Sequence, residues 1–85
     1  MAVNVIFAVY GGLRDGNSDN TEAAEVTEAL QTAMNNTPGE VVKINNTTMG
    51  GDPAVGVQKH FGAIVDVNDR RRAFACLENQ TIDFT

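Results

Sequence analysis

The stretch NNTTMGGDPAVGV, residues 45–57, has neither helical nor strand periodicity, and it separates two apolar segments that are typical of strands. Loops of this length are uncommon in compact domains and are usually functional or disordered. This one is rich in residues with specific backbone roles, since glycine reaches positive φ, proline restricts φ, and Asn and Asp bond their own backbone. We therefore expect an ordered loop that the rest of the chain holds in place.

Some side chains of this loop should hold it together, and others should face outward. Asp52 should cap the turn by accepting N–H groups from the residues after Pro53, because aspartate commonly bonds nearby backbone. At least one glycine of the loop should have a positive φ. Asn46 and Thr47 are expected to be exposed. Both interpretations of the loop, architecture and binding site, stay open at this point.

Apolar alternation predicts a strand at the start of the chain. Residues 3–10 should form it, and because both faces carry apolar residues it should be a central strand. A polar loop over residues 11–20 should follow. The residues expected to share one face of the strand are Val3, Val5, Phe7 and Val9.

Further strands are predicted on both sides of the loop. Residues 40–44 lead into it, and residues 59–67 follow it with clear alternation. The latter should form a β-hairpin with residues 71–77 across a turn at 68–70. Residues 81–85 alternate as a last strand.

The clearest periodicity predicts one amphipathic helix between the first two strands. Asp19 or Asn20 is the expected N-cap, because Glu22 follows Asp19 by three residues as in a capping box. Pro38 should end the helix, since proline cannot continue it. The apolar stripe recurs at spacings of three and four and comprises Ala23, Val26, Leu30, Ala33 and Met34.

Together these elements predict an α+β fold in a single domain, residues 1–85. The domain should have a small, mostly antiparallel sheet of about four or five strands and one amphipathic helix, in the order β-α-β-β-β-β. A chain of 85 residues leaves no room for a second core.

Charge and cysteine content narrow the partners and the compartment. The formal charge of −5 argues against nucleic acid or an anionic membrane as a partner. Cys76 is the only cysteine, so the chain has no internal disulfide framework and a reducing compartment is expected. No signal peptide and no membrane-spanning apolar run is evident, and we expect a soluble, cytoplasmic protein.

Several spaced residues resemble a known family. The pattern AxYG occurs at residues 8–11 and VTxxL at 26–30, and Asn46 precedes GDPAxGVxK at 51–59. Together they are similar to the C-terminal domain of certain mitochondrial DnaJ-type co-chaperones and to its short stand-alone relatives in microbes and fungi. This chain lacks a J domain, so co-chaperone activity is not carried over. The resemblance implies that the Gly-Asp-Pro loop belongs to the common design of the domain.

The polar side chains of the loop predict a ligand-binding surface. Amides, hydroxyls and carboxylates are the groups that match sugar hydroxyls, so a polar ligand such as a glycan is the leading prediction. We therefore expect a non-enzymatic, lectin-like binding or interaction domain, although the chain has no tryptophan and few aromatic residues to stack on a sugar. The predicted ligand-binding residues are Asn45, Asn46, Thr47, Thr48 and Asp52.

Two alternatives to a binding domain remain open. Cys76 and His60 lie on adjacent strands of the predicted hairpin, and a Cys–His pair can form a nucleophile in a small enzyme. Cys76 has apolar neighbours, however, which is typical of a buried structural thiol. The second alternative is a structural protomer of a larger assembly.

No spacing of ligands predicts a metal site, and no motif predicts a cofactor.

Self-association is the most specific expectation about partners. A domain of this size with strands apolar on nearly both faces has surface left to cover, and pairing of sheets or edges covers it. We therefore expect a homo-oligomer, most simply a dimer.

Overall fold

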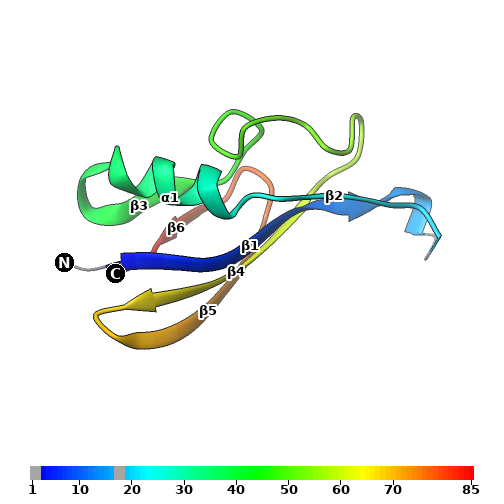
Figure 1. Ribbon diagram of the computed structural model, residues 1–85. Helices are drawn as coiled ribbons and strands as arrows, with labels where there is room; N and C mark the ends of the chain where they lie inside the picture. The colour runs from blue at the N-terminus through cyan, green and yellow to red at the C-terminus, as the bar shows by residue number, and fades with distance from the viewer. Residues whose placement is uncertain (1–2, 17–18) are drawn as a thin grey trace.

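The computed structural model describes residues 3–16 and 19–85 of the chain (Figure 1). In chain order its elements are β1 (Val3–Leu13), the short 3₁₀ segment η1 (Arg14–Gly16), β2 (Thr21–Glu25), α1 (Thr27–Asn35), the 3₁₀ segment η2 (Pro38–Glu40), β3 (Val41–Lys43), β4 (His60–Val67), β5 (Arg70–Leu77) and β6 (Thr81–Asp83). Residues 17 and 18, which belong to the predicted 11–20 loop, lie outside the described residues.

The elements form two layers. One layer is a four-stranded antiparallel sheet in the order β2-β1-β4-β5. The other contains α1 and a two-stranded antiparallel sheet of β3 and β6, and both lie on the same side of the large sheet (Figure 1). The α+β class, with one α-helix and antiparallel pairing, is therefore confirmed. The sheet is divided in two, and the last strand pairs with β3 rather than extending the large sheet.

A β-bulge in β1 changes which residues face the core. The pairing with β4 shifts between Val5 and Phe7, so Ile6 is an extra residue without a partner across the sheet. The prediction that alternate residues from Val3 to Val9 share one face is therefore wrong, because the bulge reverses the alternation after Val5. The buried side chains of β1 are Val5, Ala8 and Tyr10, and the exposed large apolar ones are Ile6, Phe7, Val9 and Leu13.

The predicted start of the helix is also wrong. Residues 21–25 form strand β2, so no helix starts at Asp19 or Asn20. The helix begins at Thr27, and its N-cap, Val26, makes no side-chain hydrogen bond to the helix. The strand predicted over residues 3–10 is longer than expected, because β1 continues to Leu13 into the predicted 11–20 loop.

Close pairing of β1 with β2 explains both differences. Gly11 lies opposite Ala23, and a Cβ on this glycine would lie 2.3 Å from the Cα of Ala23, so only glycine permits this approach. The Nε atom of Arg14 also donates to Oε1 of Glu22 at 2.6 Å, across the same hairpin. Pairing between the strands therefore overrides the helix propensity of the Glu-Ala-Ala-Glu segment.

Helix α1 closes the part of the β1 edge that β2 leaves free. The side chain of Gln31 acts as a strand would, because its Oε1 accepts the N–H of Val5 at 2.7 Å and its Nε2 donates to the carbonyl of Val3 at 3.2 Å. Oγ1 of Thr27 accepts the N–H of Ala8 at 3.1 Å. This side-chain pairing protects the edge from other strands. The predicted apolar stripe is confirmed for Val26, Leu30 and Met34, which are buried.

The large sheet has one covered and one uncovered face. The β4–β5 hairpin is confirmed, and its covered face packs on α1 and the small sheet through a core that includes Phe61 and Phe84. We call the other side the open face. Strand alternation and the pairing register give its central residues, which are Phe7, Val9, Leu13, Gly62, Ile64, Ala73, Ala75 and Leu77.

Candidate functional site

Residues 45–57 form an ordered loop, and its first turn is held by two predicted ligand-binding residues. The N–H of Thr48 donates to Oδ1 of Asn45 at 2.9 Å, and the N–H of Asn45 donates to Oγ1 of Thr48 at 3.1 Å. The Thr48 hydroxyl also donates to the carbonyl of Lys43 at 2.7 Å. These two side chains are therefore occupied with the backbone of the loop.

The predicted cap at Asp52 is confirmed. Its Oδ1 accepts the N–H of Ala54 at 3.1 Å, which fixes the turn around Pro53. The prediction of a positive φ is confirmed as well, because φ is 86° at Gly50 and 78° at Gly56. These conformations favour glycine over residues with a side chain.

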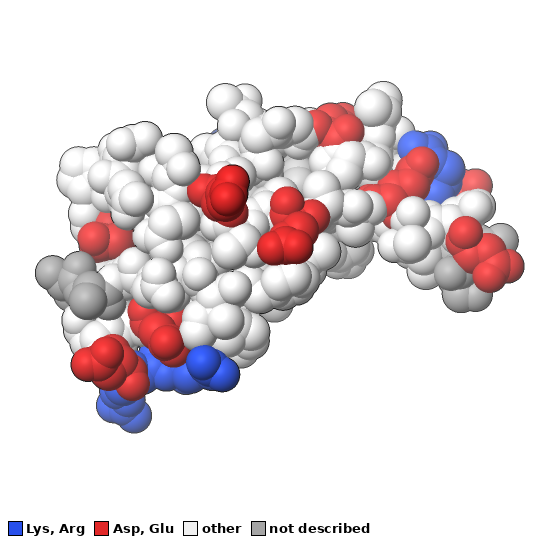
Figure 2. All heavy atoms as spheres, in the orientation of Figure 1, with Lys and Arg blue, Asp and Glu red and all other residues white. Residues whose placement is uncertain are grey.

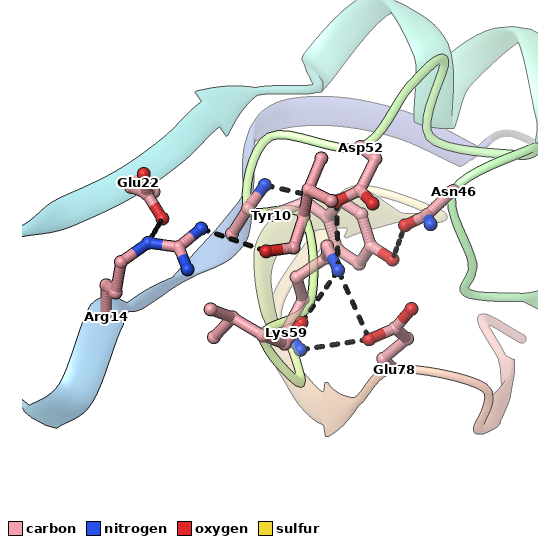
Figure 3. Close-up of polar contacts among 10 residues, drawn as sticks. Tyr10, Arg14, Glu22, Asn46, Asp52, Lys59 and Glu78 are labelled. Atoms are coloured by element: carbon pink, nitrogen blue, oxygen red, sulfur yellow. Dashed lines mark hydrogen bonds and ion pairs between the residues drawn. The ribbon is translucent and has the colours of Figure 1, made fainter.

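A buried lysine joins this loop to the sheet (Figure 3). Lys59 is 3% exposed and is the one buried charged residue among those that the structure describes. Its Nζ donates to the carbonyl of Val57 at 2.7 Å and lies 2.9 Å from Oδ1 of Asp52 and 3.6 Å from Oε1 of Glu78. The contact with Lys59 holds the pKa of the Asp52 carboxyl below its ordinary value, and the same contact raises the pKa of Lys59.

Tyr10 forms the second link between the loop and the sheet. Its ring is fully buried, and its hydroxyl donates to Oδ1 of Asn46 at 2.7 Å (Figure 3). Burial, together with the nearby carboxylates of Glu78 and Asp52, raises the pKa of Tyr10 to about 12. Asn46 is half-buried rather than exposed as predicted, because it supports this tyrosine, whereas Thr47 is exposed.

Arg14 holds the far end of the loop. Its Nη2 donates to the carbonyl of Val55 at 2.9 Å while its Nε stays bonded to Glu22 (Figure 3). The side chain of Val55 is 71% exposed. The loop therefore presents an apolar tip whose backbone is fixed.

A groove lies between α1 and the start of the loop. It has a volume of about 440 Å³, and its lining carries no charged side chain. Thr47 and Thr48 belong to it, whereas Asp52 lines a separate hollow of about 340 Å³ beside Tyr10. The structure therefore brings only two of the five predicted binding residues into this groove. The lining residues are Ala29, Thr32, Ala33, Asn36, Thr37, Thr47, Thr48 and Gly50.

Cys76 and His60 are not brought together. In the β4–β5 register His60 pairs with Leu77 and Cys76 pairs with Phe61. Neighbouring positions of a strand point to opposite faces, so the imidazole is on the open side and the thiol is on the core side. Burial raises the pKa of the Cys76 thiol, which disfavours the thiolate.

Sequence reasoning missed the role of Lys59 in this network. Lys59 lies two residues before Phe61, so it has the same parity as the core-facing residues of β4. This parity is a signal of burial. Its partner Glu78 is 19 residues away along the chain, and no local pattern connects the two.

Nothing in the described part of the chain groups three or more His, Cys, Asp or Glu residues as a metal site. Within residues 3–16 and 19–85, no helix has the length and apolar character needed to cross a bilayer. Comparisons with protein-family models, with curated proteins and with solved structures found no match to this chain.

Proposed function

We propose that this chain is a non-enzymatic binding domain that holds a neutral, hydroxyl-rich ligand, such as a glycan, in the groove between α1 and the loop. The observation that carries this proposal is the uncharged, threonine-lined groove of about 440 Å³. Its volume lies in the range usual for small-molecule sites.

The chemistry of the lining supports a neutral polar ligand. Thr32, Asn36 and Thr47 are exposed, and their side chains make no hydrogen bond with the other described residues, so they are available to a ligand. The methyl groups of Ala29 and Ala33 supply apolar contact. Hydroxyls and amides both donate and accept, which suits sugar hydroxyls, and an uncharged lining gives an ionic ligand no counter-charge.

Rigidity of the loop supports the same proposal. One wall of the groove is the turn that Asn45 and Thr48 fix, and Lys59 ties the following residues to the sheet. A wall held in one conformation binds with a smaller loss of conformational entropy than a mobile one.

A second candidate function follows from the tip of the loop. The exposed Val55, with its carbonyl fixed by Arg14, would fit a small apolar pocket on a protein partner. In this case the loop would contact a protein, and the groove would carry no ligand.

A glycan array followed by titration of any ligand found tests the proposal. We expect binding of a neutral glycan that Thr47→Ala weakens by about 3- to 10-fold, since one hydrogen bond is lost, at unchanged melting temperature. Thr81→Ala, which removes an exposed threonine outside the groove, is the matched control. Binding that survives both Thr47→Ala and Thr32→Ala would contradict the groove, and loss of a protein contact in Val55→Asp alone would favour the second candidate.

A further inference from the structure

The open face is an apolar surface without a cover in the described part of the chain (Figure 1). Phe7, Val9 and Leu77 have 47%, 38% and 37% of their surface exposed, although all three belong to the large sheet. A contiguous apolar patch of this kind is typical of an interaction site, whereas scattered exposed apolar residues are ordinary.

This face has a knob and a hollow beside each other. The ring of Phe7 protrudes, and Gly62 is its diagonal neighbour across the β1–β4 pair, about 7–8 Å away. A hollow of about 350 Å³ lies beside Gly62 and extends over Gly11 and Ala23, which contribute almost no side chain there. Knob and hollow therefore lie on one surface, which is the arrangement that a two-fold symmetric contact requires.

The charge pattern favours a second copy of this chain as the partner. Each copy carries a net charge of −5, so two copies repel each other unless they meet through an uncharged surface. The central residues of the open face carry no charge, and its charged residues lie at its margins, where Glu25 of β2 is opposite Val9 and Asp66 is paired with Arg71 at 3.6 Å. On the side of the molecule that Figure 2 shows, acidic side chains are spread along the surface and basic ones gather at the two ends.

The size of the face matches the need of a stable dimer. The eight residues of β4 and the four strands of the sheet give a flat outline of roughly 26 by 19 Å, or about 500 Å². Side-chain relief raises the accessible area above this outline. A standard protein interface takes about 800 Å² from each partner, so the open face is of the right order.

We propose that the open faces of two copies of this chain pack together around a two-fold axis, with Phe7 of each copy seated in the hollow at Gly62 of the other. The contact covers the apolar side chains that β1 exposes after its bulge. The contact does not involve the groove beside α1, so the dimer proposal is independent of the ligand proposed for that groove.

Two substitutions test the contact from opposite sides. Phe7→Lys removes the knob and adds a charge, whereas Gly62→Leu fills the hollow. A Cβ at Gly62 would meet its nearest neighbours, Val9 and Phe74, at 3.9 and 4.0 Å, which is ordinary contact, so the monomer should accept this change. Val41→Lys places the same charge on an exposed residue of β3, outside the open face, and serves as the control.

Sedimentation equilibrium at high micromolar concentration gives the outcome. We expect twice the chain mass of 9.1 kDa for the wild type and for Val41→Lys, and a rise of the dimer dissociation constant by about 30-fold or more in each open-face variant. Circular dichroism checks folding, and if Phe7→Lys does not fold, Gly62→Leu carries the test. A monomeric wild type, or a dimer that survives the folded open-face variants, would overturn the proposal.

Discussion

The loop over residues 45–57 and the open face differ in which of their groups have partners within the molecule. The loop has no strand and no helix, yet its side chains and backbone are bonded to each other and to Lys59, Tyr10 and Arg14. The open face consists of strands that pair with their neighbours in the sheet, with one bulge at Ile6, but its apolar side chains contact no other layer.

This difference shows that regular secondary structure and buried side chains are separate properties. Polar contacts fix the conformation of an irregular segment and leave a few outward groups, such as Thr47 and Val55, for recognition. Hydrogen bonds fix the strands of the sheet without using their outer side chains, so that face keeps its capacity to bind.

Removal of the buried ammonium of Lys59 should have the largest effect on the melting temperature. Lys59→Met leaves the carboxylates of Asp52 and Glu78 without their counter-charge and the carbonyl of Val57 without its donor. We expect the melting temperature to fall by more than about 10 °C, because uncompensated charges near the core are costly. Lys43→Met changes an exposed lysine and should have almost no effect; equal melting temperatures for the two variants would show that the network does not hold the loop.

Two neighbouring positions of the loop should respond differently. Asn46→Ala removes the amide oxygen that accepts the buried hydroxyl of Tyr10 and should cost about 1–3 kcal/mol in the free energy of unfolding. Thr47→Ala alters an exposed side chain and should change it by less than about 0.5 kcal/mol. Urea denaturation measures both, and a stability loss of the same size at both positions would contradict the assignment.

The pH dependence of the free energy of unfolding should report the burial of Tyr10, the only tyrosine of the chain. Its folded pKa of about 12 lies above the ordinary 10.0, so the unfolded chain loses this proton first as the pH rises. The stabilisation from this group is therefore complete below about pH 10 and is lost between about pH 10 and pH 12. Ultraviolet absorbance of tyrosinate, recorded with and without urea, should give two separate titrations; a single midpoint near 10 in folded protein would refute the burial.

Substitution at the tip of the loop should have the smallest effect on the free energy of unfolding. Val55→Ala shortens a side chain that is 71% exposed and leaves the carbonyl that Arg14 holds. The free energy of unfolding should change by less than about 0.5 kcal/mol in urea denaturation. A larger loss would mean that this side chain is packed, which would remove it as a recognition group.

Local patterns in the sequence predicted the elements that local forces determine. The apolar stripe through Leu30 and the alternation that starts at Phe61 survive in the structure, because periodicity reflects burial directly. The cap at Asp52 was predictable as well, since its bond reaches only two residues along the chain.

Contacts between residues far apart in the chain account for the predictions that the structure contradicts. Residues 21–25 have helix propensity, and only the approach of β2 to Gly11 makes them a strand. Alternation on both faces of β1 gives no sign of the bulge at Ile6. Of the candidate site, the sequence indicated the loop and Thr47, but the groove also depends on where α1 packs, which is set by the whole fold.

Amide hydrogen exchange across the loop tests the central claim most directly. The N–H of Gly51 donates to the carbonyl of Asn46 at 2.8 Å, and that of Val57 donates to the carbonyl of Ala54 at 3.0 Å. We expect both amides to be protected to a degree comparable with those of β4, and to lose that protection in Lys59→Met. Exchange of these amides in the wild type at the rate of an unstructured peptide would contradict a loop that polar contacts hold rigid.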